Sequence, residues 1–278
     1  MSGSRRRSAK GGTRPPWVIV PPALLGVLFL LLPTLALLIR APWSGLAHIY
    51  SHADATDGVD VGAALRLSVI CSLLATAVSV VLGVPLAWLL ARTRFPGRSL
   101  VRAVVTMPLV LPPVVGGLAL LLGVGRRGVF GRFLHDWFGL SLSFTPAAVV
   151  IAQAFVAMPF LVVTLEGAFR SSNLGLEEAA ATLGARRTRV FTHVTLPLVV
   201  PSLVAGVVLC WARALGEFGA TVLFAGNVMR HTQTAPTGVL TAFQASPDEA
   251  VALSLPLMLI AVVVLVALRD KWLRAAVS

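Results

Sequence analysis

The residues whose types and spacing could do chemistry are few, and the clearest are two ionisable side chains inside an apolar run. Arg213 and Glu217 are four residues apart, which places them on one face of a helix. Ionisable groups at membrane depth are costly and usually face a partner or a water-filled cavity. Two interpretations stay open: a self-neutralising ion pair that helps packing, or a pair beside a route for an anion. In the second, Glu217 would repel a free anion unless it were paired.

The patterns that accompany catalysis or cofactor binding are absent from the sequence. It has no glycine-rich phosphate loop ending in Gly-Lys-Ser or Gly-Lys-Thr, no Ser/His/Asp set and no metal-ligand spacing. His193 stands alone in a polar segment, where a surface position is the simpler interpretation. Asp54, Asp57 and Asp60 are spaced carboxylates, but the glycine and terminal acid of an EF-hand loop are missing. We therefore expect no catalysis, and neither a metal nor a cofactor bound by this chain.

The composition is that of an integral membrane protein. Hydrophobic residues make up 57% of the chain, charged residues 12%, and the mean hydropathy is +0.88. Soluble chains carry about 25% charged residues. The net charge of +12 could indicate nucleic acid, but the basic residues lie in short segments between apolar runs, as membrane topology requires. Cys71 and Cys210 both lie within apolar runs and are expected to be buried free thiols.

Six apolar runs predict an all-α polytopic fold, because a helix needs about 20 apolar residues to cross a bilayer. The expected domain boundaries are a basic tail at 1–16, a membrane domain at 17–268 and a short tail at 269–278. The expected spans are residues 17–39, 61–90, 101–124, 145–165, 198–224 and 252–268. The first run is too long for a cleaved signal peptide, so we expect it to be retained as a span.

Prolines indicate irregular backbone in two of these runs. The third begins Met-Pro-Leu-Val-Leu-Pro-Pro, and Pro108, Pro112 and Pro113 cannot all lie in a regular helix. Irregular backbone at membrane depth is tolerated only where protein or a wet cavity surrounds it. We therefore expect this segment to lie against a translocation pathway or a dimer interface; a merely kinked packing helix is the alternative. Pro159 predicts a break in the fourth run. The connecting segment at 225–250 is expected to be a polar loop, and residues 129–138 a short interfacial helix.

The distribution of Lys and Arg predicts the orientation. Of 23 such residues, 16 lie in the two tails and at 92–102 and 170–189, six lie on the opposite side, and Arg213 is within a span. Cytoplasmic segments of membrane proteins carry the excess of basic residues. Both termini and the segment 173–197 are therefore expected in the cytoplasm.

The segment 173–197 is the longest polar and helical patch in the chain. Asn173 can cap a helix, and Glu177 and Glu178 are placed in its first turn, where the helix dipole favours acids. Gly184 is expected to end that helix as a C-terminal cap would. A helix–turn–helix between two membrane spans is suited to being bound by another protein. An ordinary surface hairpin is the alternative.

This segment resembles the EAA loop of bacterial ABC importer permeases. The resemblance is carried by Glu178-Ala179-Ala180, Gly184 and Leu196-Pro197 at the family's spacing, with Val194 where the family usually has isoleucine. The resemblance implies that the loop docks into a cleft on a cytoplasmic ATPase. The residues expected to form this contact are Glu177, Glu178, Ala179, Ala180, Gly184, Leu196 and Pro197.

The residues around the ion pair narrow the resemblance further. The string at 212–221 resembles the permeases for tetrahedral oxyanions, sulfate and molybdate, and the residues at 224–227 and 232–234 are closer to the molybdate type. Ala235-Pro236-Thr237 departs from the more usual Leu-Pro-Leu. Small residues such as Gly216 and Gly219 let another backbone approach closely. The candidates for a pathway or gate are Pro112, Pro113, Arg213, Gly216, Glu217, Gly219, Thr221, Asn227, Thr232, Gln233 and Thr234.

The resemblance implies a multi-pass cell-membrane subunit that acts as a homodimer. It implies three kinds of partner besides lipid: a second copy, a separate ATPase dimer that holds ATP-Mg, and an extracytoplasmic protein that delivers molybdate or tungstate. No nucleic-acid partner is expected. A sulfate or thiosulfate importer is the alternative within the family. An ion-coupled secondary transporter is a more remote alternative, which would need neither the ATPase nor the EAA-like loop.

Overall fold

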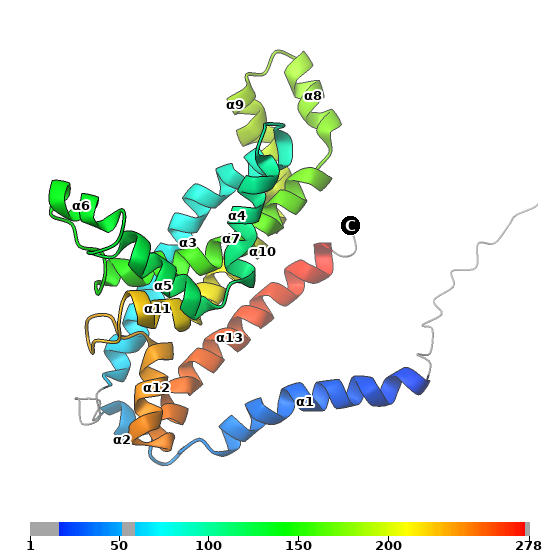
Figure 1. Cartoon of the computed structure of the whole chain (residues 1–278). Helices are drawn as coiled ribbons and strands as arrows, with labels where there is room; N and C mark the ends of the chain where they lie inside the picture. Colours follow the sequence, from blue (N-terminus) through cyan, green and yellow to red (C-terminus); the bar gives the residue numbers. More distant parts are fainter. Residues whose placement is uncertain (1–16, 52–58, 276–278) are drawn as a thin grey trace, which may run out of the picture. The chain divides into compact units, whose positions relative to one another are not determined.

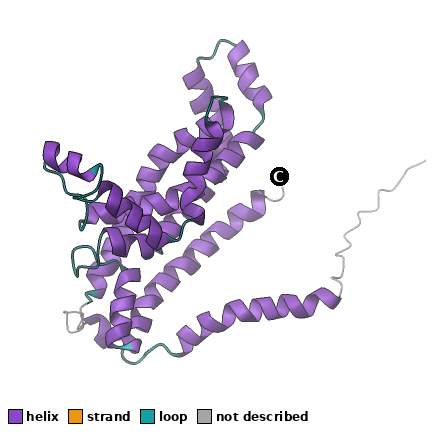
Figure 2. Ribbon diagram, viewed as in Figure 1, coloured by secondary structure: helices purple, strands orange, loops and turns teal. Residues whose placement is uncertain are grey.

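The computed structural model describes residues 17–51 and 59–275, and the fold within them is entirely helical (Figure 2). The expected all-α class is confirmed. The basic tail at 1–16, the final residues 276–278 of the other tail, and Asp54 and Asp57 lie outside the described residues. The chain divides into two compact units, residues 1–41 and 42–278, which are described separately.

The first unit contains one long apolar helix. A short 3₁₀ turn, Trp17–Ile19, leads into α1, Val20–Ile39, and Pro33 lies inside α1 without ending it. Together they are 23 residues long with a mean hydropathy of 2.5, and none of these residues is buried. An apolar surface of this length requires lipid or another protein around it.

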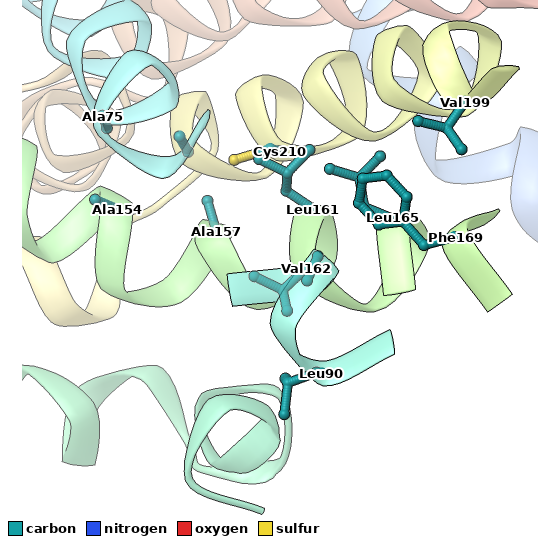
Figure 3. Packing of buried hydrophobic residues seen from close by; sticks show 12 residues of the cluster. Ala75, Leu90, Ala154, Ala157, Leu161, Val162, Leu165, Phe169, Val199 and Cys210 are labelled. Atoms are coloured by element: carbon teal, nitrogen blue, oxygen red, sulfur yellow. The ribbon is translucent and has the colours of Figure 1, made fainter. Parts of the chain in front are cut away.

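The core of the second unit is formed by three long helices. α3, Val61–Arg92, packs along α7, Pro146–Ser171, and α10, Leu196–Leu215, packs against both. Their buried side chains interdigitate, as Figure 3 shows for Leu161, Leu165 and Cys210. Glycine permits the close approach, because a Cβ on Gly83 would lie 3.2 Å from the side chain of Val162.

The expected third span is divided into two helices. α4, Arg98–Val110, and α5, Pro113–Val124, are separated by a break at Leu111 and Pro112. The prediction that this run cannot be one regular helix is confirmed. Within the described residues, five helices are long and apolar enough to cross a membrane, and α5 is a shorter apolar helix. The count of six uniform spans is therefore approximate.

The expected fifth span is also divided, which the sequence analysis did not predict. α10 ends at Leu215, and α11, Gly219–Phe224, begins after a non-helical step at residues 216–218. The fourth run shows the opposite error, because α7 continues through Pro159 without a break. Pro159 is buried, and prolines are tolerated inside membrane helices where the surrounding protein can satisfy the backbone group that they free.

The connecting segments hold more helix than expected. The loop at 225–250 contains α12, Ala235–Ala245, whose capping box joins Thr234 and Thr237. The last span begins early, because α13 runs from Pro247 to Ala275. A further short helix is α2, Leu46–Ser51. The short helix expected at 129–138 is confirmed as α6, Gly131–Phe138.

The polar segment lies at one end of the second unit. In Figure 1, α8, Leu174–Thr182, and α9, Arg187–Val190, extend beyond α7 and α10, whereas α12 lies at the opposite end. A π-helix, Phe191–Thr195, joins α9 directly to α10. The helix of the fifth span therefore begins at Leu196 rather than at the expected residue 198, and Pro197 occupies its first turn, where a proline is tolerated.

Candidate coupling loop and pathway residues

The two ends of α8 follow the local chemistry predicted for them. The side-chain oxygen of Asn173 accepts a hydrogen bond of 2.9 Å from the backbone N–H of Gly175, which caps the start of the helix. Gly184 has φ of +84°, and its N–H donates to the carbonyl of Ala181 at 3.0 Å. Glycine takes this left-handed conformation without a steric penalty, so the chain turns sharply after α8.

α8 presents its residues outward. No residue of α8 is buried, and Leu183, at the turn that follows, is 89% exposed. Leu174 and Leu176 are also exposed. The small residues Ala179 and Ala180 lie on α8 between Leu176 and Leu183 in the sequence. Exposed apolar residues on an otherwise polar loop mark a surface that contacts another molecule.

The two adjacent glutamates of α8 have different surroundings. A carboxylate oxygen of Glu177 lies 2.7 Å from a guanidinium nitrogen of Arg92, and these side chains are 17% and 9% exposed. Glu178 is exposed, and its carboxylate pairs with no side chain among the described residues. Only Glu177 lies in the first turn of α8, so the placement of both acids there is wrong by one residue. Glu177 and Glu178 were expected to act together in the contact, but Glu177 is paired and largely buried whereas Glu178 is exposed.

A groove runs beside this loop. Its volume is about 980 Å³, and it lies between the last turns of α3, α8 and the start of the helix that continues into α10. Its lining is mostly apolar and includes Val84, Leu89, Ala181, Val190 and Phe191.

A buried carboxylate near the same end was missed by the sequence analysis. Glu166 on α7 is 7% exposed and accepts hydrogen bonds from Arg102 on α4. Arg170, one turn further along α7, lies 2.7 Å from the same carboxylate oxygen. The spacing of Glu166 and Arg170 is the i,i+4 signal that could have found this site.

The ion pair inside the membrane exists, although its backbone setting differs from the prediction. A carboxylate oxygen of Glu217 lies 2.6 Å from the guanidinium of Arg213. Glu217 lies in the break after α10 rather than on the helix face, and its other oxygen accepts the N–H of Ala220 at 2.9 Å. The carboxylate is buried and Arg213 is 27% exposed. The glutamate thus neutralises the arginine and also satisfies a backbone donor at the start of α11.

The two short helices that follow the breaks, α5 and α11, approach each other closely. A Cβ on Gly117 of α5 would lie 2.7 Å from the backbone of Ala220 on α11, and a Cβ on Gly219 would lie 3.0 Å from Pro113. The predicted residues at the breaks, Pro112, Pro113, Gly216 and Gly219, are therefore brought into one region. Pro112, Pro113 and Gly216 are exposed, as residues facing a pathway or a second chain would be.

The remaining pathway candidates are mostly turned into the fold. Thr221 is fully buried on α11, and its hydroxyl oxygen has no hydrogen-bond partner among the described residues. Thr232 and Thr234 are buried in the turn before α12, where the hydroxyl of Thr232 accepts the N–H of Val228 at 3.0 Å. The side-chain amide of Asn227 donates to Thr241 at 2.8 Å, and Gln233 is also buried. Thr221 lies on α11, which packs against α5, whereas Asn227, Thr232, Gln233 and Thr234 follow α11 in the chain.

Within the described residues, five helices long and apolar enough to cross a membrane, two helix breaks and an exposed helical loop at one end are the features of a multi-pass membrane protein. The chain belongs to the family of binding-protein-dependent transport system inner membrane components, whose pattern matches residues 83–277. It is therefore a multi-pass inner-membrane protein and a non-catalytic permease subunit, because the ATPase of such systems is a separate chain.

The individual relatives of the chain within this family are molybdenum and sulfate transport permeases. The chain is 45% identical over 250 residues to the molybdenum transport system permease protein ModB of Mycobacterium tuberculosis, covering 90% of this chain and 92% of that protein. It is 43% identical to ModB of Escherichia coli over 76% of this chain and 92% of that protein. The sulfate transport system permease protein CysT of Salmonella typhimurium is 37% identical over 74% of this chain and 73% of that protein.

Solved structures confirm the fold. A bacterial ABC transporter that imports the acidic polysaccharide alginate matches with a TM-score of 0.71 at 20% identity, over 92% of this chain and 94% of that chain. An inward-facing MetNI methionine ABC transporter matches with a TM-score of 0.57 at 19% identity, over 76% and 94% of the two chains. The expected importer-permease fold is thus confirmed.

Proposed function

We propose that the chain is the transmembrane subunit of an ABC importer for molybdate. The observation that carries the proposal is the exposed α8 between α7 and α10, with EAA-like spacing, in a chain 45% identical to a molybdenum transport permease. Tungstate has the same charge and nearly the same size as molybdate and is expected to be accepted.

The proposed mechanism couples ATP hydrolysis elsewhere to a change in this subunit. The excess of Lys and Arg in the tails and at 92–102 and 170–189 supports a cytoplasmic position for both termini and α8. α8 docks into a cleft on a dimeric ATPase, which holds ATP-Mg, through its exposed face and the turn at Gly184. Two copies of the chain enclose the pathway, and closure of the ATPases shifts them between inward-facing and outward-facing states. Leu196 and Pro197, at the start of α10, connect the docked loop to the membrane core.

The anion is delivered by an extracytoplasmic binding protein and passes the breaks in the helices. One structure similar to this chain contains a periplasmic protein loaded with alginate, which supports such a partner. Arg213 lies beside the route, and its pairing with Glu217 removes the repulsion that a lone carboxylate would exert on an anion. The exposed Pro112, Pro113 and Gly216 belong to the wall that two copies share, and Gly219 packs behind them.

The test is reconstitution of the chain with its ATPase and binding protein in liposomes. We expect molybdate uptake that requires ATP and all three proteins, and that an excess of tungstate abolishes. An ATPase variant that binds but does not hydrolyse ATP is the control and is expected to give no uptake. Uptake without the ATPase would identify an ion-coupled secondary transporter instead.

A sulfate importer is the second candidate, because the sulfate permease of Salmonella typhimurium is 37% identical to the chain. The higher identity to the molybdenum permeases favours molybdate. Competition decides between them: inhibition of molybdate uptake by sulfate at equal concentration would support the sulfate assignment.

A further inference from the structure

One guanidinium group joins three elements at the end of the molecule that carries α8. Arg92 is the last residue of α3, and one of its terminal nitrogens lies 2.7 Å from Glu177 on α8 and 2.6 Å from the hydroxyl of Ser172. Ser172 caps the C-terminus of α7. Among the described residues, this is the one ion pair between α8 and a long helix of the core.

The position of this pair suits a mechanical link better than a docking contact. Glu177 lines the groove together with Glu178, but it is only 17% exposed and its carboxylate is already held by Arg92, which is 9% exposed. A paired charge in a poorly solvated place is costly to separate, so the two groups move together. Glu178, the next residue, is exposed and unpaired among the described residues.

We propose that Arg92 and Glu177 form an internal strut that carries movement of the docked α8 into α3, whereas Glu178 makes the contact with the ATPase. This inference rests on the proposed function. Of the two adjacent glutamates, Glu178 is thus the binding residue, whereas Glu177 is, with Arg92, a positioning residue.

A second ion pair extends the strut to the break in the third span. Glu166, on the same end of α7, holds Arg102 of α4. α4 leads directly to the break at Leu111 and Pro112, beyond which α5 packs against α11. The proposed path therefore runs from Glu177 on α8 through Arg92 to Ser172 at the end of α7. It continues from Glu166 on α7 through Arg102 to α4 and the break.

The test measures ATPase binding and transport separately in the reconstituted complex. For Glu177→Gln and Arg92→Gln, we expect co-purification of the ATPase and its ATP hydrolysis to be kept. Molybdate taken up per ATP hydrolysed is expected to fall by about tenfold or more, within the usual range of coupling between sites. Glu178→Gln is the matched control on the adjacent residue, and there we expect ATPase co-purification to fall instead.

The charge-swapped double variant R92E/E177R is the second test. It restores a pair of opposite charges, so uptake per ATP is expected to recover relative to either single variant, which a loss of general stability would not explain. It also keeps the proposal testable where a single variant is not recovered from the membrane, because a swapped pair that inserts and hydrolyses ATP without uptake would overturn the strut.

Two other results would overturn the strut. One is a Glu177→Gln variant that loses the ATPase as Glu178→Gln does, which would make both glutamates docking residues. The other is normal uptake per ATP in both single variants. Failure of the proposed function is distinguishable from either, because then the unmodified chain itself would neither retain an ATPase nor support ATP-dependent uptake.

Discussion

At the scale of single residues, the backbone conformation of Gly184 determines where α8 ends and therefore which surface the loop exposes. Its φ of +84° ends α8, and no atom lies within 4 Å of the place where a Cβ would be. The cost of a side chain there comes from the backbone alone, about 1–2 kcal/mol for a residue other than glycine. A change at this position therefore tests the turn and not the packing.

We expect Gly184→Val to weaken co-purification of the ATPase and ATP-driven uptake while the protein remains inserted in the membrane. Gly184→Asn is expected to be milder, because asparagine tolerates the left-handed conformation. Gly167→Ala is the matched control, because Gly167 lies in α7 with open space around its Cβ position. Full ATP-driven uptake by Gly184→Val would contradict the docking role of the turn.

Asp60 is a residue whose charge can be tested by pH. The pKa of its carboxyl is lowered from 3.8, first by the backbone N–H of Ala63, which it accepts at the start of α3, and then by Arg230. Arg230 lies 2.6 Å away, across 170 residues of sequence. A carboxyl with a lowered pKa contributes stability that is present above the unfolded pKa and lost as the pH falls through the folded pKa.

We therefore expect Asp60→Asn to unfold at a lower temperature than the unmodified chain at pH 7. Asparagine keeps the helix cap, so the difference reports the charge. The gap is expected to close as the pH falls below 3.8 and through the lowered pKa. Thermal unfolding of both proteins over a pH series checks this, and a gap that stayed constant with pH would refute the assignment to the charge. The effect is expected to be small, because Arg230 is exposed.

At the scale of elements, the contact between α5 and α11 depends on the absence of a side chain. A Cβ on Gly117 would lie 2.7 Å from the backbone of Ala220, which no packing adjustment of a side chain can relieve. We expect Gly117→Ala to lower the free energy of unfolding by about 1–3 kcal/mol, the usual range for overpacking. Unfolding in detergent measures it.

Gly123→Ala in the same helix is the control for this prediction. It has open space around its Cβ position, and alanine favours the helix over glycine, so it is expected to be neutral or stabilising. Equal stability of the two variants would show that α5 and α11 do not touch in the assembled transporter.

Elements whose ends are set by local chemistry were predictable from the sequence, and those set by tertiary contacts were not. Asn173 and Gly184 marked the ends of α8 because a cap and a left-handed turn require those residue types. The break after α10 carries no proline, and its signal lay in Gly216 and a glutamate whose carboxylate satisfies a backbone donor. Pro159 misled in the other direction, because buried surroundings let α7 continue through it.

At the scale of the whole molecule, apolar runs were enough to predict a multi-pass membrane protein, because length and hydropathy fix membrane spans. The prediction of a permease came from the resemblance of the segment 173–197 to the EAA loop. The ion pairs that connect different helices could not be predicted from the sequence. Arg92 and Glu177 are 85 residues apart, and Arg102 and Glu166 are 64 apart, so no local spacing marks either pair. No residue of the apolar α1 is buried, so this helix requires lipid or another protein around it.

The glycine contacts between α5 and α11 determine what kind of motion the permease can make. Backbones that touch directly leave no layer of side chains to slide or exchange rotamers. We therefore expect the two short helices to move together, with rotation between states at the two non-helical joints that begin at Leu111 and Gly216. Opening would then depend on the backbone torsions at these two hinges, residues 111–112 and 216–218.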